Sequence, residues 1–306
     1  MAPELYGRVL KVSKYGVLPR GDRPPVRFPQ TAYANINDKP QATADELWGD
    51  VLKGRLMLFA ERSASYSGDI MGPKLAYVLQ KDATNPDTMK DRYISDPRNE
   101  ANDRIDNDRR PQCVMPRHRN VARRIGYWGR RYHPIPILIP KRDVKGAFKL
   151  LPVSIRGLEY MGCLISISIA MYLAMFFGWR PSPANWGLIS TLLMQYVAAF
   201  RPRDEYIDGP ETFVAFHYVD DGACVEPWAG MRHWQAVALW EHALTTCLGH
   251  KSMHRKKREV EGNSDTTIPL WGIIVSAGRD TLSLPSEKLA DPVNFWPLAI
   301  TTPAQP

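Results

Sequence analysis

Two adjacent aspartates inside an apolar stretch constrain the fold of this chain more than any other feature. Asp220 and Asp221 follow the largely apolar run 213–219, and Gly222 separates them from the apolar run 223–225. Neighbouring carboxylates repel each other, and a divalent cation neutralises that repulsion. A strand, a tight turn and a second strand carry both carboxylates at the tip of a hairpin. An ordinary acidic surface turn has the same short sequence, so the motif alone leaves both interpretations open.

A third aspartate follows another apolar run upstream. Residues 136–140 are apolar with a proline at each end, Asp143 comes shortly afterwards, and Gly146 indicates a turn. Three carboxylates from two strand ends hold two Mg²⁺ ions about 3.5–4 Å apart in two-metal phosphoryl-transfer enzymes. There, one ion lowers the pKa of an attacking 3′-hydroxyl, and the other bridges the triphosphate and the leaving pyrophosphate. The sequence therefore predicts a catalytic, metal-binding trio of Asp143, Asp220 and Asp221 with two Mg²⁺ ions, or Mn²⁺ in their place.

The motifs around these aspartates resemble those of the reverse transcriptases, specifically the palm and fingers of retroelement polymerases of the long-terminal-repeat or tyrosine-recombinase type. Asp-Val-Lys-Gly-Ala-Phe at 143–148 matches the first catalytic motif, and Tyr-Val-Asp-Asp at 218–221 matches the Tyr-x-Asp-Asp motif. Further segments follow in the order of the family. They are 75–84 and 92–98 for the fingers, 177–184 for the Gly/Pro motif, 270–273 for the primer grip and 282–289 for the thumb connection.

This resemblance implies an α+β fold, a polymerase palm with an antiparallel sheet backed by helices, and a fingers subdomain. It divides the chain into an N-terminal extension with the start of the fingers (1–70), the fingers (71–135), the palm (136–275) and a primer-grip exit with a truncated thumb connection (276–306). The implied activity is RNA-directed DNA polymerisation, with an RNA or DNA template, a primer and deoxynucleoside triphosphates as partners. Because little thumb is expected, a retroelement remnant that only binds nucleic acid is the competing hypothesis.

The resemblance also assigns nucleotide contacts. Phe148 is the aromatic residue that obstructs the 2′-hydroxyl of the incoming sugar, with an ordinary core phenylalanine as the alternative. Lys256 or Lys257 is the candidate general acid for the pyrophosphate, and the sequence does not choose between them. The full implied set is Lys81 and Arg92 at the triphosphate, Val144, Ala147, Phe148 and Gly178 around the nucleotide, and Val144 as a further metal contact.

Charge and cysteine content fit this interpretation without requiring it. The formal net charge of +8 and the pI of about 9.3 suit a polyanionic partner. Basic residues gather at 119–131 and 254–258, with a plain solvated surface as the alternative. Four cysteines form no CxxC pair, so we expect reduced thiols and no structural zinc. With no recognisable signal peptide, we expect an intracellular protein, and its oligomeric state stays open.

One uncharged segment, 160–179, is close to the ~20 residues that a membrane-spanning helix needs. A single-span membrane protein is therefore a further hypothesis. Within that segment, however, the run Ile-Ser-Ile-Ser-Ile at 165–169 alternates as a strand does, so we expect a hairpin and no membrane partner.

Other elements are predicted from periodicity and punctuation. Strands are expected at 73–80, 92–95 and 134–140, with a turn between the first two. Helices are expected at 42–59, at 182–200 with Ser182 as its N-cap, and at 234–248. We expect Trp179 and Trp186 to serve packing more often than base stacking.

Overall fold

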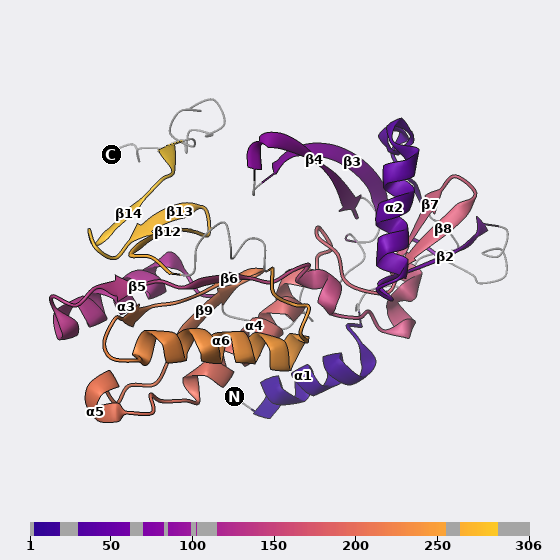
Figure 1. The fold of residues 1–306 in the computed structure, drawn as a ribbon. Helices are drawn as coiled ribbons and strands as arrows, with labels where there is room; N and C mark the ends of the chain where they lie inside the picture. Colours follow the sequence, from indigo (N-terminus) through magenta and orange to yellow (C-terminus); the bar gives the residue numbers. More distant parts are fainter. Residues whose placement is uncertain are drawn as a thin grey trace, which may run out of the picture.

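The computed structural model describes residues 3–18, 30–61, 70–82, 85–98, 102, 115–254 and 264–286, without the side chains of 81–87. Helices and several small sheets form an α+β fold (Figure 1). The helices are α1 (Pro3–Tyr15), α2 (Pro40–Val51), α3 (His118–Tyr132), α4 (Ser182–Ala198), α5 (Glu205–Asp208) and α6 (Arg232–Leu248), with 3-10 turns η1 (Ala34–Asp38), η3 (Phe148–Leu150) and η4 (Ile155–Tyr160).

The central sheet carries the predicted aspartates. Its strand order is β6-β10-β9, from β6 (Lys141–Asp143), β10 (Asp221–Cys224) and β9 (Ala215–Tyr218). Strands β9 and β10 form an antiparallel hairpin with Val219 and Asp220 at its tip, which confirms the predicted hairpin. Helix α4 packs on β9 and on α6, and both helices lie against one face of this sheet (Figure 1). The other face packs through Phe216 and Ala223 on α3 and on the hairpin of residues 267–276, so the aspartates lie at the end of a sheet that is covered on both faces.

A second sheet, ordered β1-β7-β8-β2, lies with α2 on the right of Figure 1. It consists of β1 (Gln30–Thr31), β7 (Gly162–Ile165), β8 (Ser168–Tyr172) and β2 (Leu56–Ala60). Segment 160–179 contributes the β7–β8 hairpin, as its alternation predicts, so the transmembrane helix considered for this segment is wrong. In the part of the chain that the structure describes, no helix is long and apolar enough to cross a membrane.

A long hairpin lies beside this sheet, at the top of Figure 1. Strand β3 (Lys74–Asp82) pairs with β4 (Asn85–Asp96) over nearly its whole length, which confirms the two predicted strands. The turn expected over 82–90 is wrong for 85–90, because these residues already belong to β4. The helix predicted for 42–59 is only partly right. Helix α2 ends at Val51, Gly54 takes a positive φ of 66°, and the chain continues as β2 against β8. The apolar run Leu-Met-Leu-Phe-Ala fits either element, and long-range pairing decides for the strand.

The N-cap of helix α4 lies one residue earlier than predicted. Pro181 is the N-cap and Ser182 is already helical, because its hydroxyl donates to the Phe176 carbonyl at 2.9 Å instead of capping the helix. Trp179 and Trp186 are 1% and 0% exposed, so both are packing residues in this structure.

The remaining strands build the left side of Figure 1 with α3. They are β5 (Ile137–Leu138) paired with β11 (Glu226–Pro227), and the sheet of β12 (Thr267–Leu270), β13 (Ile273–Ser276) and β14 (Thr281–Ser283). Val121, Ile125 and Trp128 on one face of α3 join Leu270 and Val275 in a separate hydrophobic cluster. This cluster fixes the β12–β13 hairpin beside the central sheet.

Candidate active site

Strand register brings two of the three predicted aspartates together. Asp143 on β6 is the direct partner of Asp221 on β10, so their Cα atoms lie about 4.5–5.5 Å apart. Asp220 precedes Asp221 in the tip of the hairpin, and its carbonyl accepts a hydrogen bond of 2.7 Å from the Val144 N–H. Asp143 is 8% exposed, whereas Asp220 and Asp221 are partly exposed. The three residues therefore share one end of the central sheet.

We call residues 218–221 the aspartate turn. Three consecutive carbonyl groups of this turn are held by three different elements. The indole N–H of Trp186 on α4 donates to the Val219 carbonyl, and the Val144 N–H after β6 donates to the Asp220 carbonyl. The indole N–H of Trp271, between β12 and β13, donates to the Asp221 carbonyl at 3.3 Å. These contacts fix the backbone from which the two carboxylates project.

The aspartate turn and the β12–β13 turn both contain strained residues. Val219 has a φ of 52° and Trp271 a φ of 50°, in the left-handed region that β-branched and bulky side chains avoid. Such a conformation costs about 1–3 kcal/mol and persists where surrounding contacts determine it. The three carbonyl contacts provide that determination at the aspartate turn. Strain of this kind concentrates at functional sites.

A lysine lies among the carboxylates. Lys141 and Asp143 project from the same face of β6, and the Lys141 ammonium lies 3.5 Å from a carboxylate oxygen of Asp221. Arg142, on the opposite face, pairs with Glu241 on α6 at 2.8 Å. Among the described residues, no three His, Cys, Asp or Glu side chains are grouped so that they could hold a metal ion. The three aspartates are neighbours along the backbone and across the sheet, and the carboxylate of Asp221 has the ammonium of Lys141 beside it.

The predicted nucleotide residues near Asp143 are buried. Val144, Ala147 and Phe148 are 2%, 1% and 3% exposed. The Phe148 ring contacts Phe177 with ring centroids 4.5 Å apart and Trp186 at 6.2 Å. Phe148 therefore lies between Trp186, which holds the aspartate turn from α4, and Phe177, which lines the pocket described below.

Gly178 has a different neighbour from the one that the resemblance implies. It has a φ of 88°, and a Cβ there would lie 3.1 Å from the Ser95 carbonyl oxygen and 3.2 Å from Pro97. Its carbonyl accepts a hydrogen bond from the Asn102 side chain at 2.8 Å. The missing side chain allows the loop after Phe177 to approach the end of β4.

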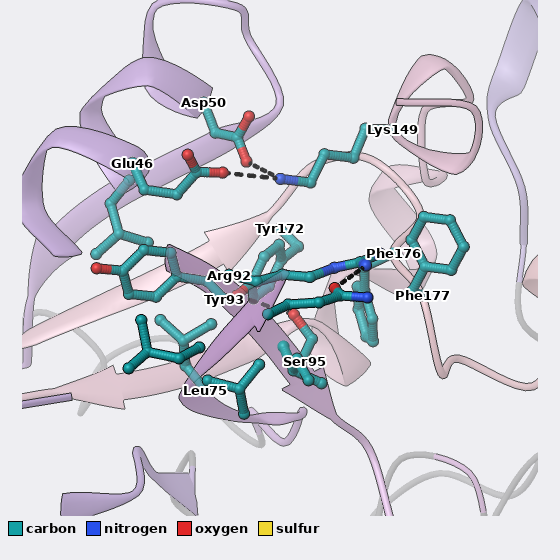
Figure 2. Close-up of a pocket in the computed structure, with 15 residues that line it drawn as sticks. Glu46, Asp50, Leu75, Arg92, Tyr93, Ser95, Lys149, Tyr172, Phe176 and Phe177 are labelled. Carbon is teal, nitrogen blue, oxygen red and sulfur yellow. Dashed lines mark hydrogen bonds and ion pairs between the residues drawn. The ribbon is translucent and has the colours of Figure 1, made fainter. Parts of the chain in front are cut away.

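A pocket of about 430 Å³ opens beside these residues, between α2, the β3–β4 hairpin and β8 (Figure 2). Arg92 lines it, and its guanidinium donates to Gln80 at 2.5 Å. Lys149 lies on the opposite side, where Asp50 at 2.6 Å and Glu46 at 3.5 Å hold its ammonium. The apolar wall includes Leu75, Tyr172, Phe176 and Phe177. Of the predicted triphosphate residues, Arg92 is thus placed on this pocket.

Other predicted residues lie outside what the structure describes. The backbone of Lys81 is in β3, opposite Met89, but its side chain is not described. Lys256 and Lys257 fall between the described ranges. In the basic run of α3, Arg119, Arg123 and Arg130 are exposed. Arg124 instead stacks on Trp128 at 4.2 Å and pairs with Glu226 at 3.5 Å, so it is a structural residue.

Sequence reasoning missed several residues that shape this site. Trp186 was expected to pack, but its hydrogen bond to the aspartate turn was not predicted. Trp271 entered only as part of the primer-grip segment 270–273, without a contact to the aspartates, and Lys141 was given no role. The sequence offers one signal for Lys141, since residues two apart on a strand share a face. It offers none for the tryptophan contacts, which depend on how distant elements pack.

Comparisons with known proteins identify the fold. No protein-family model matches the chain, and no curated protein matches it. Among solved structures, it is similar to the foamy viral protease-reverse transcriptase in complex with dsDNA, with a TM-score of 0.54, 14% identity and 96% of this chain covered. The same protein in complex with an RNA/DNA hybrid gives a TM-score of 0.53, 13% identity and 90% coverage. The native prototype foamy virus protease-reverse transcriptase gives a TM-score of 0.51, 15% identity and 83% coverage of this chain.

The chain spans between 28% and 53% of the length of those three solved chains. At such identities the similarity establishes the fold and leaves the chemistry to the residues. The chain therefore has a reverse-transcriptase-like α+β fold, with Asp143 and the aspartate turn at one end of its central sheet.

Proposed function

We propose that this chain is an RNA-directed DNA polymerase domain of retroelement origin, of the long-terminal-repeat or tyrosine-recombinase type. In this proposal the central sheet with α4 and α6 is the palm, and the β3–β4 hairpin belongs to the fingers. The observation that carries it is the register that sets Asp143 opposite Asp221, next to Asp220, within a reverse-transcriptase-like fold. Its partners are a template of RNA or DNA, a primer and deoxynucleoside triphosphates.

The donor set suits Mg²⁺, because this ion prefers hard oxygen ligands and carboxylates supply them. Asp143, Asp220 and Asp221 would hold two ions, together with Val144 through its main chain. Bound Mg²⁺ would acidify the primer 3′-hydroxyl and neutralise the triphosphate. Since the described side chains are not yet grouped around a metal, loading requires the carboxylates to turn, and Asp221 to exchange Lys141 for the ion.

The other residues position the substrates in this proposal. The primer 3′-oxygen forms a bond to the α-phosphorus of the nucleotide, and the bond from that phosphorus to pyrophosphate breaks. Arg92 and Lys81 bind the triphosphate, since guanidinium and ammonium groups match phosphate oxygens. Phe148, supported by Phe177 and Trp186, limits the space at the sugar 2′ position. Ala147, which is buried beside Phe148, and Gly178, which lets the loop after Phe177 approach β4, would shape the nucleotide site from behind.

Primer extension tests the proposal. The chain is incubated with a labelled primer on an RNA and on a DNA template, with deoxynucleoside triphosphates and Mg²⁺ or Mn²⁺. We expect extension on both templates and its loss in Asp220→Asn. Asp45→Asn on α2, where Asp45 accepts from Gln41 at 2.9 Å, is the matched control and should keep activity. Binding of primer–template without any extension would instead favour a retroelement remnant that only binds nucleic acid.

A further inference from the structure

The three contacts that hold the carbonyl groups of the aspartate turn differ in accessibility. Trp186 is 0% exposed and Val144 is 2% exposed, so both contacts lie inside the protein. Trp271 is partly exposed, at the tip of the β12–β13 hairpin. Only this third contact comes from a surface hairpin, and it is therefore the one that a molecule bound outside can reach.

Trp271 also contacts the aspartate turn through its ring. Its centroid lies 5.6 Å from that of Tyr218, with the planes tilted by 45°. On its other side, His118 at the start of α3 lies 5.5 Å away. Tyr218 is itself 42% exposed. The indole is thus placed between α3 and the aspartate turn and meets that turn twice, through its N–H and through its ring.

The backbone around Trp271 commits the indole to this position. Leu270 and Ile273 are paired, so Trp271 and Gly272 form a two-residue turn in which both residues have positive φ, 50° and 84°. This geometry fits the twist of a hairpin, but a bulky residue in its first position is unfavourable. A glycine or asparagine there would form the same turn at lower cost. The unfavourable choice points to a role for the indole itself.

We propose that Trp271 is a positioning residue for the aspartates: through its N–H and its ring it fixes the backbone of the aspartate turn, from which Asp220 and Asp221 project. The catalytic role of the aspartates in this inference rests on the proposed function. The role of Trp271 in holding them rests only on its contacts with the aspartate turn.

Two substitutions separate the contacts. Trp271→Phe keeps a ring against Tyr218 and removes the N–H donor, and Trp271→Ala removes both. Trp228→Ala is the control, because Trp228 is 56% exposed and lies outside the aspartate turn. The first measurement is amide hydrogen exchange of the full chain, which needs no activity. We expect exchange at 218–222 to become about 3- to 10-fold faster in Trp271→Ala and less so in Trp271→Phe, with β3–β4 unchanged.

The second measurement is the dissociation constant of the chain for Mn²⁺ in the absence of other ligands. Binding is detected through the electron paramagnetic resonance signal of free Mn²⁺. A residue that only stabilises the hairpin leaves this constant unchanged, whereas a positioning residue raises it, by about 3- to 10-fold in Trp271→Ala. Unchanged exchange at 218–222 overturns the inference, and so does faster exchange without any change in Mn²⁺ affinity. If the parent chain binds no Mn²⁺, the proposed function fails, and the exchange data alone decide whether Trp271 fixes the turn.

Discussion

At the scale of single residues, Lys141 is the clearest device that the structure adds to the candidate site. Its ammonium is 3.5 Å from Asp221, and both side chains are largely shielded, at 14% and 24% exposed. A cation at this distance competes with a metal for the same carboxylate. We therefore expect Lys141→Gln to tighten Mn²⁺ binding about 2- to 5-fold, the equivalent of one weak ion pair. Lys39→Gln, which breaks the Lys39–Asp91 pair elsewhere, should leave the affinity unchanged. Weaker binding in Lys141→Gln would contradict this role.

Phe148 gives a second prediction at this scale. Its ring is 3% exposed and packs on Phe177, so Phe148→Ala should lower the free energy of unfolding by about 3–5 kcal/mol. If the ring also limits the space at the sugar 2′ position, the ratio of ribonucleotide to deoxynucleotide incorporation should be far higher in the mutant than in the parent. The ratio is measured by single-nucleotide extension below the melting temperature of the mutant. An unchanged ratio with lowered stability would make Phe148 a core residue only.

His217 links pH to stability directly beneath the aspartate turn. It is 0% exposed, near Trp186 and Trp240, and burial lowers its pKa to about 3. The unfolded chain binds the proton more readily, with a pKa near 6.5. The contribution of His217 to the free energy of unfolding is therefore complete above about pH 6.5. It is lost as the pH falls towards about 3, by up to about 1.4 kcal/mol per pH unit. Denaturant unfolding at pH 7, 6 and 5 should give a flatter profile for His217→Phe than for the parent, with exposed His250→Gln as the control.

At the scale of elements, a buried ion cluster joins α3, β11 and α6. Arg232 and Glu226 are both fully buried and 2.5 Å apart, and Arg232 and Arg124 lie over the ring of Trp128. Burial raises the pKa of Glu226, and both arginines oppose that shift. Replacing Arg232 leaves the buried Glu226 with only the longer contact to Arg124 at 3.5 Å, so Arg232→Met should lower the free energy of unfolding by up to about 3–5 kcal/mol. The partly exposed Lys39–Asp91 pair is weaker, so Lys39→Met should lower the free energy of unfolding by less than about 1 kcal/mol. Similar losses in both variants would show that the cluster is better hydrated than its geometry indicates.

The same scale shows where sequence reasoning succeeds and where it stops. The β9–β10 and β3–β4 hairpins follow from local apolar runs and turn residues, and both were predicted. Helix α2 was predicted too long, because the apolar run after Gly54 suits helix and strand equally and only pairing with β8 selects the strand. The sequence suggested that Asp143 lies near Asp221 only through motif order. Their pairing, the pocket beside Arg92 and the Trp271 contact arise from packing between distant segments, which no local pattern encodes.

At the scale of the whole molecule, the basic residues behind the net charge of +8 lie on several surfaces, and one of these surfaces adjoins the candidate site. Helix α3 begins at His118, which contacts Trp271 beside the aspartate turn, and it presents exposed Arg119, Arg123 and Arg130 along its length. Helix α1 carries exposed Arg8, Lys11 and Lys14 but lies below α4, on another side of the molecule (Figure 1). The two helices thus offer equal charge at different distances from the aspartates.

This arrangement gives a matched test of nucleic-acid binding. In the proposed function α3 contacts the phosphates of primer–template, and each such contact steepens the dependence of log affinity on log salt concentration by about 0.9. Replacing the three exposed α3 arginines with glutamine should therefore lower that slope by up to about 2.7 and weaken binding at low salt. The α1 triple variant, Arg8→Gln with Lys11→Gln and Lys14→Gln, makes the same change in net charge and should keep the parental slope. An equal decrease of the salt slope in both variants would contradict a specific contact at α3. It would mean that the duplex is attracted by the overall charge of the protein, because the α1 residues lie on another side of the molecule. Fluorescence anisotropy of a labelled duplex between 50 and 200 mM salt, the range over which such contacts are released, measures both slopes directly.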